Sequence, residues 1–194
     1  MLINHLLLAV FWTVYCVLHS VMAGITIKEK LKNVLGKKFI YYRLFYTVFA
    51  LVTLVWIFLF QLSIDSPLLF QTSTILRIAG YIIATIGLLI MLVCIKGYFM
   101  SLSGLKSLFQ ATATNTLIIS GIHKYVRHPL YLGTFTFIWG LLVIFPYLSL
   151  LIANVVITVY TTIAIKFEED KLILEFGDAY KKYQESVPKL IPRL

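Results

Sequence analysis

Long runs without a charged residue alternate with short basic segments along the chain, and they predict membrane-spanning helices. The first three runs cover residues 1–27, 44–64 and 78–95. A helix needs about 20 consecutive apolar residues to cross the hydrocarbon core of a bilayer, and these runs lie within the usual range. The first run lacks the basic start of a cleaved signal peptide. We therefore expect it to be retained as a helix over residues 2–24.

The fourth uncharged run, residues 129–165, is too long for a single crossing. As one helix it would extend about 55 Å at 1.5 Å per residue, whereas the hydrocarbon core is about 30 Å thick. Pro146 lies near the middle of the run, between Phe145 and Tyr147, where it favours a turn. The pattern thus predicts a C-terminal helical hairpin, and with it an all-α integral membrane protein of five transmembrane helices.

The distribution of lysine and arginine predicts the orientation, because these residues collect in short cytoplasmic loops. The segment between the first two spans is strongly basic, and so are the stretch after the third span and the tail after the fifth. The segment after the second span has no Lys or Arg before Arg77. We therefore expect an integral membrane protein with its N-terminus outside and its C-terminus in the cytoplasm.

Composition supports the membrane assignment and indicates which kind of partner the chain binds. The chain is 60% hydrophobic and only 13% charged, whereas soluble domains are about 25% charged. Its net charge of +9 suits anionic lipid headgroups rather than nucleic acid. Cys16 and Cys94 both fall in apolar runs, which argues against a disulfide framework or a metal site. We expect one domain over residues 1–194, with three spans in residues 1–95 and the hairpin and polar segments in residues 96–194.

The first candidate site surrounds Pro129, at the predicted start of a helix. Proline fits the first helical turn, and the exposed N–H groups there bind anions. Arg127 and His128 precede it, and Tyr125 and Tyr131 add aromatic faces and hydroxyls. The alternative is a belt of aromatic and basic residues at the membrane interface.

The second candidate site is the acidic group Glu168, Glu169 and Asp170, directly after the last apolar residues of the fifth span. Glu168 and Glu169 differ by about 100° around a helix, so we expect them to have different partners. One carboxylate would point back toward the basic segment and bind a cation or hydroxyls. The alternative is a solvated helix start.

The tail after these acids has its own pattern. Gly177 can end the preceding helix, and Asp178 can cap the next one. Tyr180 and Tyr183 then share one helix face. The alternative for this segment is a short amphipathic helix lying at the membrane interface.

Other chemistries have weaker support. His19 lies near the cytoplasmic end of the first span, and an ionisable residue there suggests function, although a local hydrogen bond is the alternative. His123 and His128 are five residues apart, which does not match a zinc pair on one helix face. The sequence also lacks a phosphate-binding glycine loop and a nucleophile-elbow motif. We therefore expect no metal site.

Together the motifs resemble the isoprenylcysteine carboxyl methyltransferase superfamily. The resemblance runs from about residue 117 to residue 192 and joins the segment around Arg127-His128-Pro129 to the acidic pair and the tail. The N-terminal half, with Leu18-His19-Ser20, is more similar to the NnrU-like branch and to bacterial methanethiol S-methyltransferases. Membrane sterol reductases share a similar arginine–histidine–proline segment but resemble this chain less at the acidic pair.

The resemblance implies a membrane-embedded methyltransferase that binds S-adenosylmethionine (SAM) at the cytoplasmic face and releases S-adenosylhomocysteine. The implied catalytic residues are Arg127, which would hold the SAM carboxylate, and Glu168, which would hold the SAM amine or ribose hydroxyls. Replacing Glu169 should weaken SAM binding less, because its side chain is turned about 100° away on the helix. At His123 the family usually has tyrosine. The implied cofactor-binding residues are Leu117, Ile118, His123, Tyr125, His128, Pro129, Leu130, Tyr131 and Glu168.

One departure from the family bears on the methyl acceptor. Where the carboxyl methyltransferases have an arginine that holds the substrate carboxylate, this chain has Ala164. We therefore expect a small thiol or an uncharged lipophilic acceptor, with a carboxylate or an amine headgroup as alternatives. Two other functions stay open at this point: an NADPH-dependent membrane reductase of related fold, and a non-catalytic membrane protein that retains the fold.

Overall fold

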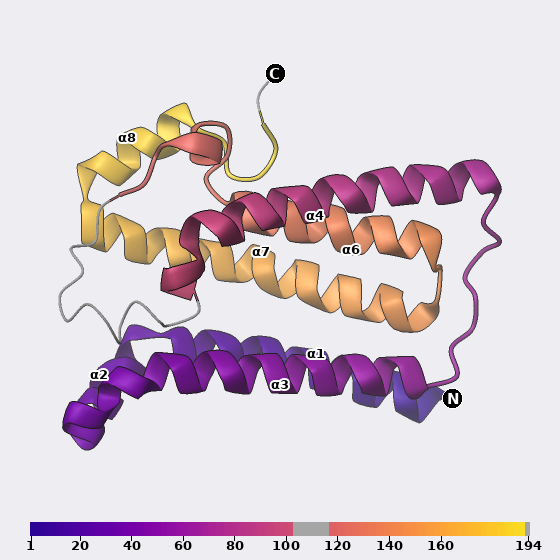
Figure 1. Ribbon diagram of the computed structural model, residues 1–194, viewed down its shortest axis with the longest axis horizontal. Coiled ribbons are helices and arrows are strands. Elements are labelled where there is room, and N and C mark those ends of the chain that lie inside the picture. Colours follow the sequence, from indigo (N-terminus) through magenta and orange to yellow (C-terminus); the bar gives the residue numbers. More distant parts are fainter. Residues whose placement is uncertain (103–116, 193–194) are drawn as a thin grey trace. The chain divides into compact units, whose positions relative to one another are not determined.

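A computed structural model describes residues 1–102 and 117–192 (Figure 1). The part of the chain it describes is helical, apart from loops and one isolated bridge between Leu68 and Tyr147. The helices are α1 (Leu2–Ala23), α2 (Ile25–Leu35), η1 (Gly36–Tyr41), α3 (Tyr42–Ser63), α4 (Thr74–Leu102), η2 (Gly121–Lys124), α6 (Pro129–Ile144), α7 (Leu148–Phe176) and α8 (Asp178–Ser186).

Among the residues that the structure describes, four helices are long and apolar enough to cross a membrane. They lie at Leu2–Ala23, within Ile27–Ser63, at Thr74–Lys96 and at Leu148–Phe176. Their positions confirm apolar helices at the first three predicted spans and at the second arm of the hairpin. The predicted turn is also confirmed, because α6 ends at Ile144 and α7 begins at Leu148. α6 itself has only 16 residues, so the count of five crossings stays a prediction.

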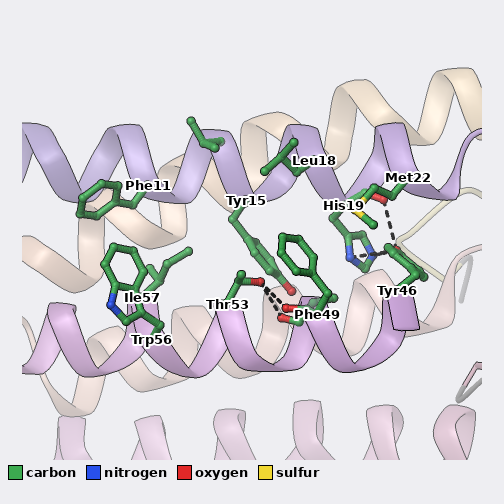
Figure 2. Close-up of a pocket in the computed structure, with 12 residues that line it drawn as sticks. Phe11, Tyr15, Leu18, His19, Met22, Tyr46, Phe49, Thr53, Trp56 and Ile57 are labelled. Atoms are coloured by element: carbon green, nitrogen blue, oxygen red, sulfur yellow. Dashed lines mark hydrogen bonds between the residues drawn. The ribbon is translucent and has the colours of Figure 1, made fainter. Parts of the chain in front are cut away.

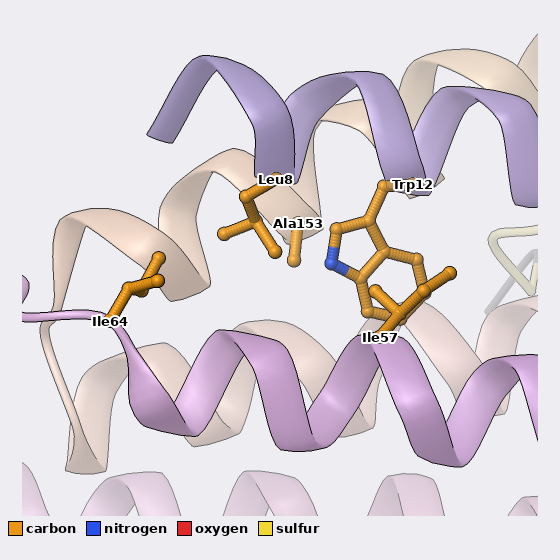
Figure 3. Packing of buried hydrophobic residues seen from close by; sticks show 5 residues of the cluster. All are labelled: Leu8, Trp12, Ile57, Ile64 and Ala153. Atoms are coloured by element: carbon orange, nitrogen blue, oxygen red, sulfur yellow. The ribbon is translucent and has the colours of Figure 1, made fainter. Parts of the chain in front are cut away.

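The chain divides into two compact units. In the first, α1 and α3 pack together with the beginning of α7 around a small apolar core (Figure 3). Leu8 and Trp12 of α1 meet Ile57 of α3 there, and Ala153 of α7 joins the same cluster. The Trp12 indole N–H donates to Gln61 Oε1 at 3.0 Å, so a polar pair buried between two apolar helices is satisfied.

In the second unit, glycines allow α4 and α6 to approach each other closely. A Cβ atom on Gly87 would lie 2.7 Å from the carbonyl oxygen of Gly133, and one on Gly140 would lie 2.6 Å from the Ala84 nitrogen. Small residues of this kind bring helix backbones together in membranes. Further along, the Trp139 indole N–H donates to Thr158 Oγ1 at 3.1 Å, which connects α6 to α7.

α7 continues well beyond the apolar run, and this extension positions the acidic pair. It ends at Phe176, and Gly177 has a positive φ of 56°, which glycine adopts without strain. The predicted stop at Gly177 is therefore confirmed. The predicted cap is wrong: Asp178 lies in the first turn of α8 and binds Lys181 at 3.0 Å, because Gly177 occupies the N-cap position.

Candidate functional site

The second unit brings the segment around Pro129 and the acidic group of α7 together at the start of α6. The chain passes through η2 and then extends to His128, the N-cap of α6. Pro129 is the first helical residue and is fully buried. Because proline cannot donate a hydrogen bond, its place at the first turn leaves no buried donor unsatisfied. The start of α6 thereby positions three side chains: those of Arg127 and His128, which precede the helix, and that of Tyr131 in its first turn.

Glu169 is the centre of the site and is buried, with 6% of its surface exposed. Its Oε1 accepts hydrogen bonds from Arg127 Nε at 2.8 Å and from His128 Nε2 at 3.1 Å. Its other oxygen, Oε2, lies 3.2 Å from Lys189 Nζ. A buried carboxylate needs such partners because burying an unpaired charge costs several kcal/mol. Glu169 therefore joins α6, α7 and the tail.

The tail segment, residues 187–189, is also held by backbone hydrogen bonds. The Arg127 N–H donates to the Pro188 carbonyl at 2.9 Å, and the His128 N–H donates to the Lys189 carbonyl at 3.1 Å. Arg127 Nη1 donates to the carbonyls of Gln184 and Val187. The Arg127 guanidinium therefore donates to the Glu169 carboxylate and to two backbone carbonyls near the C-terminus at the same time.

Glu168 faces a different direction and is partly open to solvent, with 44% of its side chain exposed. Its Oε2 accepts a hydrogen bond from the Tyr131 hydroxyl at 3.0 Å and lies 3.8 Å from His128 Nδ1. The His128 and Tyr131 rings stack with centroids 5.6 Å apart. The two acids thus accept hydrogen bonds from different residues, as their positions on the helix predicted, while His128 lies within 4 Å of both. The two ring nitrogens of His128 face different carboxylates.

His123 supports the loop that precedes this helix start. Its Nδ1 lies 3.2 Å from the Arg127 carbonyl, and its own carbonyl accepts a hydrogen bond from the Tyr183 hydroxyl at 2.7 Å. Burial lowers the pKa of His123, so the imidazole is neutral at pH 7. Burial also raises the pKa of Tyr180, which packs beside Tyr183.

The other predicted cofactor residues lie nearer the surface. Leu117 packs against the apolar cluster of Tyr180, Tyr183 and Val187. Ile118 and Tyr125 are exposed, at 43% and 67%. The core of the site therefore consists of the residues around Glu169 and the Glu168–Tyr131 pair. Leu117 lies outside this core, against the apolar cluster of Tyr180, Tyr183 and Val187.

Sequence reasoning ranked Glu169 below Glu168 and did not single out Lys189. Helical spacing carried a signal for Glu169, because it shares a face with Ile165 and Ile173 at i−4 and i+4. Ile165 is fully buried and Ile173 packs against the tail cluster. Lys189 carried no comparable signal, since it reaches Glu169 only through the path of the tail.

Comparison with known proteins places this site in a family. The sequence model of the family described as phospholipid methyltransferase matches residues 75–179, more than half of the chain. The match includes Arg127, His128, Tyr131 and both glutamates but ends before Lys189.

Curated relatives carry related names. A methanethiol S-methyltransferase of Bradyrhizobium diazoefficiens is 42% identical over 38% of this chain and 27% of its own length. The protein-S-isoprenylcysteine O-methyltransferase of Schizosaccharomyces pombe is 38% identical over 39% of this chain and 33% of its own length. The methanethiol S-methyltransferase of Pseudomonas deceptionensis is 27% identical over 94% of this chain and 70% of its own length.

The aligned region thus covers about a quarter to a third of the first two of these relatives. No solved structure matches the chain. Because the family match spans more than half of the residues and contains the hydrogen-bonded centre of the site, the chain belongs to the phospholipid methyltransferase family, a family of membrane methyltransferases.

Proposed function

We propose that this protein is a membrane-embedded, SAM-dependent methyltransferase whose cofactor binds at the start of α6. The observation that carries the proposal is the solvent-accessible Glu168–Tyr131 pair, held beside this helix start by the buried Glu169 network. The pair lies within the segment that matches the methyltransferase family.

The donors and acceptors at this position suit SAM. Its carboxylate would bind at the N–H groups of the first turn of α6, where the helix dipole favours an anion. Its amine or ribose hydroxyls would bind the exposed carboxylate of Glu168. The Tyr131 ring, stacked on the buried His128 ring, would provide an aromatic face for the adenine or the sulfonium.

In this proposal the residues divide into those that contact SAM and those that position them. The sequence suggested that Arg127 holds the SAM carboxylate, but its guanidinium is 9% exposed and is bonded to Glu169 and to tail carbonyls. By the same criterion His128, 5% exposed and bonded to Glu169, is a positioning residue. We therefore assign Arg127, His128, Glu169 and Lys189 as positioning residues, and Glu168 and Tyr131 as the contacts.

SAM supplies the electrophilic methyl group on its sulfonium. The protein would contribute orientation of the cofactor and a site from which water is excluded, since an in-line displacement depends chiefly on positioning. A thiol acceptor would release its proton to water before transfer, so that the thiolate attacks the methyl group and needs no strong base at that moment. The proposed network therefore acts by holding the cofactor rather than by moving protons.

The proposed acceptor is a small, uncharged thiol. Ala164 offers no cation at the position where the carboxyl methyltransferases have an arginine, and losing such a charged partner costs about 1.5–3 kcal/mol of binding. The relative that aligns over 94% of the chain is named for methanethiol. A prenylcysteine carboxylate and a lipid amine are the other acceptors to be compared.

The proposed topology has five crossings. The 16 residues of α6 extend about 24 Å, which suffices for a short crossing where the bilayer thins or flanking residues adapt. With the basic segments inside, the start of α6 would face the cytoplasm, where SAM is available.

Titration calorimetry on detergent-purified protein tests this proposal. SAM should bind and should raise the melting temperature, whereas NADPH should do neither. Glu168→Gln should weaken SAM binding at least tenfold, about 1.4 kcal/mol. Asp170→Asn, a matched change of an exposed acid two residues away, should not. Unchanged affinity in Glu168→Gln, or stabilisation by NADPH in place of SAM, would refute the assignment.

A further inference from the structure

The segment between α1 and α3 has the pattern of a helix that lies along a membrane surface. α1 ends before Gly24, whose extended backbone (φ −66°, ψ 150°) interrupts the helix, and α2 begins directly after it. Figure 1 shows α2 at an angle to α1 rather than in line with it. The Tyr42 hydroxyl donates to the Met22 carbonyl at 2.8 Å, so the segment leaves and rejoins the two spans at one place. It is therefore held at one face of the membrane.

The apolar residues of α2 form a stripe along one side of the helix. At about 100° per residue they fall within about 100° of one another, and they are Ile27, Leu31, Val34 and Leu35. The protein covers this stripe incompletely, since Val34 is 81% exposed and Leu35 is 37% exposed. An amphipathic helix that is held at a membrane surface buries such a stripe among the headgroups and the first part of the acyl chains.

Lysines lie on both sides of this apolar stripe. Lys30 lies along one edge and Lys32 beyond the other, whereas Glu29 lies on the opposite side of the helix. A lysine side chain can run along an apolar surface and still place its ammonium group in the polar layer. η1 adds two further exposed lysines, Lys37 and Lys38.

These four exposed lysines are available to an external anion. The ion pairs found within residues 1–102 and 117–192 involve none of them. An anionic leaflet attracts lysines at its surface, and the attraction decays over a Debye length of about 10 Å at 0.1 M salt. A helix that lies flat on the membrane keeps its lysines within that distance.

The neighbouring pocket between α1 and α3 does not select a headgroup (Figure 2). Its lining exposes almost only carbon, and the His19 and Tyr46 side chains at one end are hydrogen-bonded to each other. Such a surface suits the acyl chains of different lipids equally. A preference for one lipid class must therefore come from the charges of α2 and η1.

We infer that α2 and η1 form a binding surface for anionic phospholipids, with the apolar stripe of α2 among the acyl chains and the four exposed lysines at the phosphates. Lipids with a cationic headgroup bind more weakly, because that group offsets the charge of their phosphate. The inference goes beyond the proposed methyl transfer and does not depend on it, since the surface belongs to the first unit alone.

Electron paramagnetic resonance of spin-labelled lipids tests the headgroup preference. The full chain is reconstituted in phosphatidylcholine vesicles that contain a trace of spin-labelled phosphatidylglycerol or phosphatidylcholine. The wild type should bind the phosphatidylglycerol label at least about threefold more tightly. Salt at 1 M should remove most of this preference, because the Debye length falls to about 3 Å. Equal binding of the two labels by the wild type would refute the inference.

A matched pair of variants locates the preference on the chain. Lys30→Gln/Lys32→Gln should reduce it by about half or more. Lys181→Gln/Lys182→Gln removes the same charge from exposed positions of α8 and should leave it unchanged. An equal fall in both variants would assign the preference to the net charge of the protein, and a fall in neither would exclude α2. Either result would overturn the inference.

Nitroxide labels at neighbouring positions test whether α2 lies in the interface. Val34→Cys labels the apolar stripe, and Asn33→Cys labels an exposed position about 100° away. Unsubstituted protein, whose two cysteines are buried, gives the background. In vesicles containing phosphatidylglycerol, oxygen should relax mainly the Val34 label, and a water-soluble nickel chelate should relax mainly the Asn33 label. Equal access of the chelate to both labels would show that α2 projects into water, contrary to the inference.

Discussion

At the scale of single residues, two adjacent glutamates differ in environment because a helix turns about 100° per residue. Glu169 points into the protein and accepts from Arg127 and His128, whereas Glu168 remains 44% exposed and accepts from Tyr131. Sequence predicted that the acids would have different partners. It could not identify the buried one with certainty, because that depends on which face of α7 meets the tail.

The matched pair Glu169→Gln and Glu168→Gln tests this division. Removing the charge of Glu169 leaves the Arg127 guanidinium buried without its carboxylate, so we expect a loss of about 3 kcal/mol in the free energy of unfolding. The contact with Lys189 adds little, because that side chain is 45% exposed. Glu168→Gln should change stability by less than about 0.5 kcal/mol. Denaturant titration in detergent measures both, and equal stability losses would contradict the assignment of roles.

His123 should make stability depend on pH. Burial lowers its pKa in the folded state, so on acidification the unfolded chain takes up this proton before the folded chain does. The folded protein should lose stability as pH falls through about 6.5, the ordinary value for histidine. His123→Gln, which retains a donor for the Arg127 carbonyl, should flatten this part of the profile. Thermal melts between pH 8 and pH 5.5 check it, and an unchanged slope in the variant would show that another group is responsible.

At the scale of elements, uncharged runs and turn residues were sufficient to locate most helices. The spans near residues 2–24, 44–64 and 78–95 and the turn around Pro146 all have helical counterparts or a turn in the structure. The runs could not predict how far α7 continues past its apolar part, since charged residues also form good helices. Nor did they predict the close approach of α4 and α6, which depends on glycines that face each other across the two helices.

Gly87→Ala tests that approach. The added methyl group would lie 2.7 Å from the Gly133 carbonyl oxygen and against the Phe137 backbone. Overpacking of this kind costs about 1–3 kcal/mol, so the melting temperature should fall. Thr85→Ala, on the exposed side of the same helix, is the control and should have little effect. If both variants melted together, the contact between α4 and α6 would not contribute as described.

At the scale of the whole molecule, hydropathy and charge identified a membrane protein, and the motifs identified its family. The four long apolar helices in residues 1–102 and 117–192 and the family match agree with this.

Reporter fusions at both ends test the topology. Five crossings place the two termini on opposite sides, whereas four would place them on the same side. A reporter after Leu194 should be active only in its cytoplasmic form, because the tail is basic. A reporter before Met1 should be active only in its external form. Both termini on one side would exclude five crossings.

The most direct test of the central claim is transfer of an isotopically labelled methyl group from SAM by the purified protein in lipid vesicles. Parallel reactions offer a short alkyl thiol, a farnesylated cysteine and vesicles containing phosphatidylethanolamine. The account predicts that label appears fastest in the thioether, that Glu168→Gln slows this at least tenfold, and that Asp170→Asn does not. Efficient methyl ester formation on the prenylcysteine without transfer to the thiol would contradict the proposed acceptor. Absence of transfer to every acceptor by folded protein would contradict the proposed methyltransferase activity.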